Sequence, residues 1–441
     1  MREVATGILL AAATIGAAPA MAQAQAAPAA SAQTALEAAF EAAGRGDLAS
    51  LEGALPGARG EAALLIRARL AAAAGGAAAD PALVRLAGSH DPATRQTALA
   101  ILTESAFANA DYAGAARWGR ALAEMQTARG LTHEAAGSAQ TWRLAALLAG
   151  RGAMAVDGTV AQGTIPARID KVGLPRIDIA VNGIAQETVF DTGANLSVLS
   201  AETARRMGVT MIAGETSVSN GVEGTVGVRV GVAERIEIAG TIIRNVPFLI
   251  IDDSNLTFPQ VPGGYDIRAI IGLPVMRALG RVRVESAAGR FTVLPADPNG
   301  AGAPNLIARG NDLFVAASVG GRALPLHLDT GSNQTTLSAL YAEAAPAAVA
   351  ALQTSEAQRS SAGGTARTRV ATWANAPIAL AGRSLVLPQL PVALPNADGP
   401  PPRNYGVLGS NALRAFESYT LDFRAMRLEL GEPVRSAAAV N

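Results

Sequence analysis

The C-terminal two thirds of the chain contain an internal repeat, and this repeat limits the folds open to the sequence. The run Phe190-Asp191-Thr192-Gly193 recurs as Leu328-Asp329-Thr330-Gly331, 138 positions later. An apolar-apolar-Gly triplet follows each run by about 80 positions, as Ile270-Ile271-Gly272 and as Val407-Leu408-Gly409. A nearly constant spacing between corresponding motifs indicates two units of one fold in tandem.

Both copies consist of short Val- and Ile-rich segments separated by glycines, which is typical of β-strands and turns. The stretch from Ala296 to Pro304 is rich in Pro, Gly and Ala and interrupts this pattern. The sequence therefore predicts a first β lobe over residues 160–296, a linker over 297–305 and a second β lobe over 306–431. Residues 432–441 form a C-terminal tail.

Residues 34–152 have a different pattern, in which Ala and Leu recur at helical spacing. We expect an α-helical domain here, broken by Pro-Gly and Gly-Gly punctuation. The expected helices cover residues 35–44, 60–74, 81–88, 92–107, 112–129 and 132–149. Residues 109–118 resemble the turn and second helix of a tetratricopeptide-type unit. A plain packing domain and a partner-binding solenoid both remain open for this region.

The first 22 residues have the layout of an export signal. Arg2 is followed by an apolar stretch over residues 8–18 and by Ala20-Met21-Ala22, a small-x-small cleavage pattern. We expect a signal peptide at 1–22, a flexible leader at 23–33 and a periplasmic or secreted product. No later segment is apolar for long enough to predict a membrane span.

Composition excludes several classes of function. Lys plus Arg and Asp plus Glu are both 36, a balance that argues against a nucleic-acid-binding protein. Cysteine is absent, which removes disulfides, thiol nucleophiles and cysteine-bound zinc. Three scattered histidines make a histidine-rich metal site improbable. We therefore expect no metal and no cofactor.

The two Asp-Thr-Gly runs, the two apolar-apolar-Gly triplets and the closing stretch of residues 406–428 resemble the aspartic peptidases. The likeness is to the bacterial retropepsin-like branch, with two lobes fused in one chain, and it covers about residues 165–431. It implies two tandem retropepsin/pepsin-like β-barrel lobes and says nothing about the helical region. With the N-terminal α-helical hairpin domain expected from residue spacing, the fold class is a multidomain α plus all-β protein.

The resemblance implies an aspartic endopeptidase, a hydrolase in which Asp191 and Asp329 form the catalytic pair. Two carboxyls about 3 Å apart cannot both ionise, so they share a proton; one can activate water while the other polarises the peptide carbonyl. Gly193 and Gly331 let the backbones approach closely. The Thr192 and Thr330 hydroxyls are expected to bond across to the opposite loop. Both aspartates come from one chain, so a monomer acting on a peptide or protein substrate suffices.

The two motifs differ in the residue that follows them, Ala194 in the first and Ser332 in the second. We expect the Ser332 hydroxyl to donate to Asp329 and to make Asp329 the preferred carboxylate. His327, two residues before Asp329, is interpreted as a structural histidine. Glycine-rich turns are tentative substrate-covering flaps at Gly221 and Gly224 in the first lobe, and at Gly363 and Gly364 in the second.

Two other functions fit the same sequence. A peptide-binding protein could keep this fold without turnover, although intact Asp and Gly at both motifs speak against it. Alternatively, the helical region could bind a protein partner, with the β lobes as a scaffold.

Overall fold

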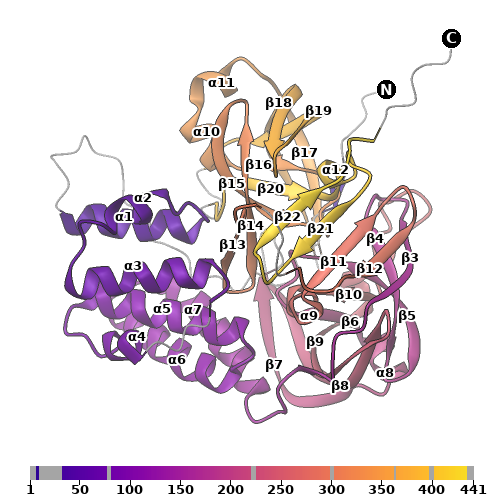
Figure 1. Cartoon of the computed structure of the whole chain (residues 1–441), viewed down its shortest axis with the longest axis horizontal. Helices are drawn as coiled ribbons and strands as arrows, with labels where there is room; N and C mark the ends of the chain where they lie inside the picture. The colour runs from indigo at the N-terminus through magenta and orange to yellow at the C-terminus, as the bar shows by residue number, and fades with distance from the viewer. Residues whose placement is uncertain are drawn as a thin grey trace. The chain divides into compact units, whose positions relative to one another are not determined.

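A computed structural model describes residues 6–8, 32–76, 81–219, 225–297, 302–361, 364–396 and 402–434. The contacts between residues divide the chain into two compact units. One unit holds the helices that precede residue 154, together with residues 307–314. The other holds the described β-rich remainder. The chain is thus a multidomain protein with an N-terminal helical region followed by a β-rich part that contains barrel-like sheets (Figure 1).

The helical unit contains each helix expected from the sequence, with ends shifted by a few residues. Its helices are α1 (Ala32–Gly44), α2 (Ala49–Ala54), α3 (Gly60–Ala73), α4 (Pro81–Leu86), α5 (Pro92–Ala108), α6 (Tyr112–Ala128) and α7 (Thr132–Leu148). The sequence did not predict α2, a six-residue helix that ends just before the Pro56-Gly57 break.

Side-chain caps fix the start of two of these helices. The Asp91 carboxylate accepts a hydrogen bond from the Thr94 amide at 2.9 Å at the start of α5, and Asp111 accepts one from the Gly114 amide at 2.9 Å at the start of α6. These caps satisfy amides that have no partner within the helix. Behind them, leucine and isoleucine side chains of α3, α4 and α5 pack into one buried cluster.

A buried ion cluster ties residues 307–314 into the helical unit. Glu104 on α5 lies 2.7 Å from the Arg69 guanidinium and 3.3 Å from that of Arg309. Arg309 also donates to the Gly44 carbonyl at 2.9 Å. Burial raises the pKa of Glu104, but the two arginines outweigh burial and hold it below its ordinary value. Residues 307–314 were expected to begin the second β lobe, yet they cluster with the helices.

The β-rich unit opens with the short strand β2 (Ala155–Val156) and continues with two β repeats, defined here as residues 163–293 and 306–430. The first repeat contains β3 (Gly163–Ile169), β4 (Pro175–Val181), β5 (Ile184–Phe190), β6 (Ser197–Ser200), α8 (Ala201–Arg206), β7 (Thr210–Ser219), β8 (Thr225–Ile238), β9 (Thr241–Ile251), a 3-10 turn η1 (Asp253–Leu256), β10 (Ala269–Ile271), α9 (Leu273–Leu279), β11 (Arg281–Glu285) and β12 (Arg290–Val293).

The second repeat follows the same order. It contains β13 (Leu306–Arg309), β14 (Asp312–Val319), β15 (Arg322–Asp329), β16 (Thr336–Leu337), α10 (Ala339–Ala344), α11 (Pro346–Ala350), β17 (Gln353–Ser361), β18 (Gly364–Leu380), β19 (Arg383–Ala393), β20 (Gly406–Gly409), α12 (Ser410–Leu413), β21 (Tyr419–Asp422) and β22 (Arg427–Leu430).

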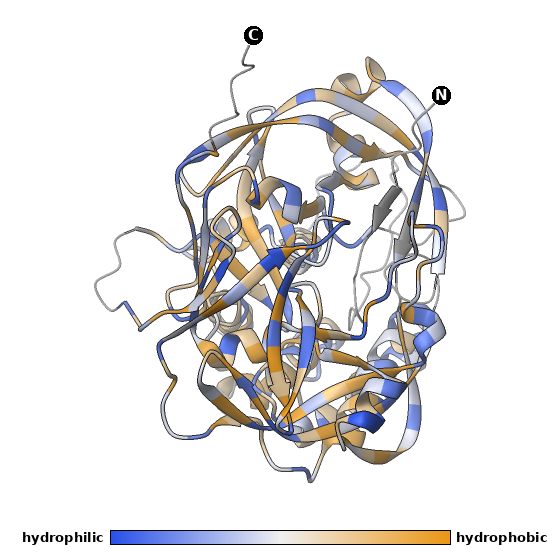
Figure 2. Cartoon of the chain, turned by 90° about the vertical axis from the view of Figure 1, so that its right-hand side faces the viewer, coloured by the Kyte–Doolittle hydropathy of each residue, from blue (hydrophilic) through white to orange (hydrophobic). Residues whose placement is uncertain are grey.

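Strands in both repeats bury alternate residues, as a sheet with one covered face requires. On β8, for example, Val226, Val228 and Val230 are buried. Polar and apolar residues accordingly alternate along many strands in Figure 2. Within the described residues, no helix combines the length and the apolar character needed to cross a membrane.

The sheet topology is repeated as well. In the first repeat β10 lies between β5, to which it is parallel, and β6, to which it is antiparallel. In the second repeat β20 lies in the same way between β15 and β16. β6 then pairs in parallel with β9, and β16 with β19. The repeated motifs of the sequence therefore occupy equivalent strands.

The last hairpins of the two repeats join in one sheet, in the order β22-β21-β11-β12-β3. β11 and β21 are antiparallel, with Arg283 directly opposite Thr420. These two residues are themselves equivalent in the repeat, 137 positions apart. A residue that faces its own equivalent marks an approximate two-fold relation between the repeats. β21, expected within the second lobe, thus pairs with β11 of the first repeat, while β22 pairs with β21.

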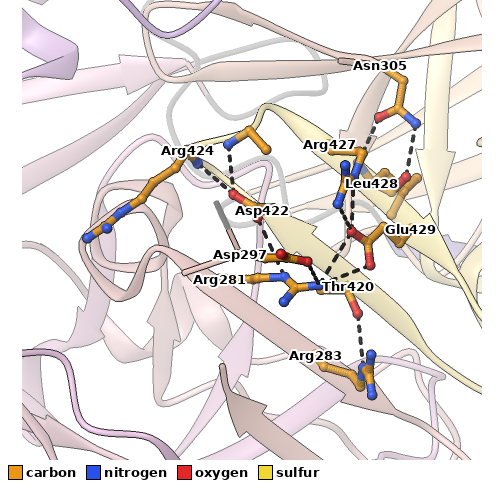
Figure 3. Close-up of polar contacts among 11 residues, drawn as sticks. Arg281, Arg283, Asp297, Asn305, Thr420, Asp422, Arg424, Arg427, Leu428 and Glu429 are labelled. Carbon is orange, nitrogen blue, oxygen red and sulfur yellow. Dashed lines mark hydrogen bonds and ion pairs between the residues drawn. The ribbon is translucent and has the colours of Figure 1, made fainter. Parts of the chain in front are cut away.

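Figure 3 shows the polar contacts at this shared sheet. The Arg281 guanidinium lies 3.5 Å from the carboxylates of Asp297 and Asp422 and 3.3 Å from that of Glu429. Arg283 donates to the Thr420 hydroxyl at 3.1 Å. The contacts of Arg281 and Arg283 join the ends of the two repeats.

Strand β1 (Thr6–Ile8) pairs in parallel with β17, with Thr6 opposite Gln358. The rest of the expected signal peptide lies outside the described residues. So do residues 23–31 of the leader, residues 298–301 of the linker and residues 435–441 of the tail.

The Glu104 cluster predicts a large loss of stability in Glu104→Gln. The substitution leaves two buried guanidinium groups without their carboxylate, which costs about 3–5 kcal/mol. Urea unfolding of the full-length chain, followed by the helical circular-dichroism signal, measures the loss. Glu124→Gln is the matched control, because its i,i+4 pair with Arg120 is exposed and contributes about 0.5 kcal/mol. Equal losses in the two variants would contradict the role of the buried cluster.

Candidate active site

Each Asp-Thr-Gly run lies at the end of a buried strand. β5 ends at Phe190, directly before Asp191, and β15 ends at Asp329 itself. Both aspartates and both following threonines are fully buried. The Asp191 amide donates to Ile271 of the neighbouring β10 at 3.0 Å, and Asp329 is paired with Gly409 of β20. The topology thus places each aspartate beside the apolar-apolar-Gly triplet of its own repeat.

Reciprocal threonine bonds lock the two runs together, as the sequence predicted. The Thr192 hydroxyl donates to the Leu328 carbonyl at 2.7 Å, and the Thr330 hydroxyl donates to the Phe190 carbonyl at 2.7 Å. Each hydroxyl also accepts a bond at 3.0 Å from the amide of the other threonine. Four hydrogen bonds therefore cross between the repeats at this one point.

The glycine of each run faces the aspartate of the other. A Cβ placed on Gly193 would lie 2.6 Å from the Asp329 Cγ, and one on Gly331 would collide with the Asp191 carboxyl. Any larger residue at either position would displace the opposite carboxyl group. The close approach expected of these two glycines is therefore present.

The two carboxyl groups form a coupled pair. The pKa of Asp191 is held well above its ordinary value by burial and by the negative charge of Asp329, against the opposing bond from the Gly193 amide, which donates to Oδ1 at 2.8 Å. Burial also raises the pKa of Asp329, but the charge of His327 opposes the rise. The pKa values of both carboxyl groups therefore lie above the ordinary value for aspartate, with burial as the main cause.

The expected role of Ser332 is wrong. Its hydroxyl donates to the Gln334 carbonyl at 2.9 Å within its own loop, not to Asp329. Serine hydroxyls often bond to a backbone group nearby in sequence in this way. The Ser332 amide donates to the main-chain carbonyl of Asp329 at 3.1 Å and so closes the turn that follows the aspartate.

Two hydroxyl residues that the sequence analysis missed hold the glycine triplets in place. The Gly272 amide donates to the Ser197 hydroxyl at 3.1 Å, and the Gly409 amide donates to the Thr335 hydroxyl at 3.1 Å. Ser197 and Thr335 are 138 positions apart. The signal that could have indicated them is a hydroxyl side chain at equivalent positions of the two repeats, serine in one and threonine in the other.

The loop over residues 170–174 of the first repeat reaches the site segments of the second. Asn333 donates to the Val172 carbonyl at 3.1 Å, and the Ser410 hydroxyl donates to the Gly173 carbonyl at 2.9 Å. The Asp170 carboxylate folds this loop by accepting bonds from the amides of Val172 and Leu174. No motif pointed to this contact, because its members are distant in sequence.

Asp170 is itself held by two buried side chains. It accepts a bond from Arg176 at 2.8 Å and one from the Tyr265 hydroxyl at 2.6 Å, and Arg176 also donates to that hydroxyl at 2.6 Å. Burial raises the pKa of Tyr265, which stays a neutral donor. The loop that joins the repeats therefore rests on a satisfied polar network.

Two long hairpins, β7–β8 and β17–β18, flank the tentative flap glycines in the sequence. β7 and β8 pair up to Ser219 opposite Thr225, so Gly221 and Gly224 belong to the connection, which is outside the described residues. β17 and β18 pair up to Ser361 opposite Gly364. Gly364 begins β18, whereas Gly363 is outside the described residues.

A search of the described residues finds no group of three or more His, Asp or Glu side chains arranged to hold a metal. The described residues do bring together two buried carboxyl groups, each of which faces the glycine of the opposite run.

A family model described as aspartyl protease matches residues 177–275. The matched segment includes Asp191 and the triplet ending at Gly272, and it stops before the second repeat. Comparison with curated proteins gives no significant match. The family match supports peptidase activity for this chain, with a peptide as the substrate class.

The threonine bonds predict that Thr330→Val destabilises the β-rich unit and lowers activity. Valine has a similar shape but leaves one donor and one acceptor unsatisfied in a buried place, at about 1–3 kcal/mol each. Thr330→Ser keeps the hydroxyl and should behave nearly as wild type. Urea unfolding and peptide cleavage measure both variants. If Thr330→Val were as stable and active as Thr330→Ser, the threonine bonds would not be what holds the site.

Proposed function

We propose that the chain is an exported aspartic endopeptidase in which the two β repeats are the two lobes of a retropepsin- or pepsin-like enzyme. Asp191 and Asp329 are its catalytic residues, one from each lobe. The observation that carries the proposal is the pair of buried carboxyls, each faced by the glycine of the opposite loop and locked by the threonine bonds.

The proposed reaction is the direct attack of water on a peptide carbonyl. The Asp329 carboxylate takes a proton from water as the water oxygen bonds to the carbonyl carbon, and Asp191 gives its proton to the carbonyl oxygen. The resulting gem-diol collapses when Asp329 passes its proton to the amide nitrogen and the C–N bond breaks. A gem-diol hydroxyl returns its proton to Asp191, which leaves a carboxylic acid, an amine and both aspartates in their starting states. No covalent intermediate with the protein forms, in keeping with a chain that has no cysteine.

The long hairpins β7–β8 and β17–β18 are proposed as flaps that cover an extended peptide. Their strands flank the expected glycines in the sequence, and hairpins of this length can close over a cleft and exclude water. The helical unit is not assigned a catalytic role. It remains a candidate for binding a protein partner.

The shared site predicts that Asp191→Asn and Asp329→Asn each reduce peptide cleavage by at least about a thousandfold. Because the two groups act as a unit, the double variant should lose no more than either single variant. Digestion of a peptide library, read by mass spectrometry, measures the loss. Asp178→Asn, an exposed aspartate on β4, is the matched control.

Two outcomes of this experiment would contradict the proposal. A single Asn variant at Asp191 or Asp329 that kept full activity would refute the pair. Tight binding of peptides by wild type without any cleavage would replace the proposal with the non-catalytic peptide-binding alternative.

Export predicts that the mature protein begins at Gln23, after cleavage behind Ala22 in the Ala20-Met21-Ala22 pattern. Mass spectrometry of the intact protein recovered from a Gram-negative periplasm or from culture medium measures its first residue. Ala22→Arg should block cleavage and leave the longer form. A mature protein that still starts at Met1 in wild type would contradict export.

A further inference from the structure

His327 is a buried titratable residue beside the carboxyl pair, and the proposed reaction does not use it. It lies on β15 two positions before Asp329, and 5 % of its surface is exposed. Residues two apart on a strand share one face, with Cα atoms about 6.6–7 Å apart. The imidazole is therefore on the same side of the strand as the Asp329 carboxyl, in a place that solvent hardly reaches.

The equivalent position in the first repeat carries no charge. Val189 is 138 positions before His327 and two before Asp191, and it is fully buried. Both positions are paired with an apolar residue on the neighbouring strand: Val189 is opposite Ile270 on β10, and His327 is opposite Val407 on β20. The two halves of the site thus differ in one ionisable side chain at this position.

We propose that His327 is a positioning residue for the shared proton: its imidazolium charge keeps Asp329 ionised and leaves the proton on Asp191. This inference rests on the proposed function. A histidine is cationic in the acidic range in which a shared-proton pair works, and a cation near one carboxyl favours the charged form of that carboxyl. The direction agrees with the charge effect of His327 on Asp329 described above.

The other ionisable groups around β15 are few. β20, one neighbour of β15, has no titratable residue, and β14, the other, has Asp312 alone. On β15 itself, Arg322 is at the far end and donates to the Ala344 carbonyl. From the opposite repeat, Asp191 is the group that faces Asp329. Among the described residues of these elements, His327 is thus the basic side chain nearest to the carboxyl pair along the strand.

The test is the pH profile of kcat/KM for peptide cleavage in His327→Val, which copies Val189, and in His327→Gln. Loss of the cation raises the pKa of Asp329, so the acid limb should move to higher pH by about one unit. The fall in kcat at the optimum should be small by comparison. His133→Gln, at an exposed histidine of the helical unit, should leave the profile in place. An acid limb that stays put in both His327 variants overturns the inference.

A second measurement needs neither turnover nor a His327 variant that folds. The chain has three histidines, so the ring signals of His327 can be followed by NMR as pH is lowered. They should show an inflection where the carboxyl pair titrates, and this inflection should survive in Asp191→Asn and vanish in Asp329→Asn. Persistence in Asp329→Asn overturns the inference. If wild type cleaves no peptide while the inflection behaves as expected, the proposed function fails and the charge coupling stands.

Discussion

The hydrogen bonds exchanged by Thr192 and Thr330 are the contact on which the site depends. Each threonine hydroxyl donates to the chain just before the opposite aspartate and accepts from the opposite threonine amide. All of these groups are buried, so losing one partner would leave others unsatisfied at a cost that water cannot offset. These bonds hold the carboxyl groups of Asp191 and Asp329 close together, although the two residues are 138 positions apart in sequence.

Contacts away from the site maintain the same approximate two-fold relation. Arg283 faces its own equivalent Thr420 where β11 pairs with β21, and the loop folded by Asp170 contacts Asn333 and Ser410. The relation is not exact at the site. Val189 and His327 occupy equivalent positions two residues before the aspartates, so one half of the site carries an ionisable side chain that the other half lacks.

Much of this could be read from the sequence, because a repeat with a fixed spacing reveals equivalent positions directly. The motifs and the family resemblance gave Asp191, Asp329 and their threonine and glycine partners. The helical spacing of Ala and Leu gave helices such as α5 and α6. Ser332 was misjudged because a hydroxyl chooses among nearby acceptors by loop geometry, which a motif does not encode. No sequence motif indicated the hydrogen-bonded network of Asp170, Arg176 and Tyr265, because Tyr265 is 95 positions from Asp170 and meets it only in the folded chain.

Binding of a statine-type inhibitor, measured by titration calorimetry, tests the central claim most directly, because its hydroxyl is designed to lie between two carboxyls that share a proton. One chain supplies both aspartates, so the account predicts one inhibitor per chain. It also predicts much weaker binding in both Asp191→Asn and Asp329→Asn, with Asp178→Asn unchanged. One inhibitor per two chains, or undiminished binding when either site aspartate is replaced, would contradict it.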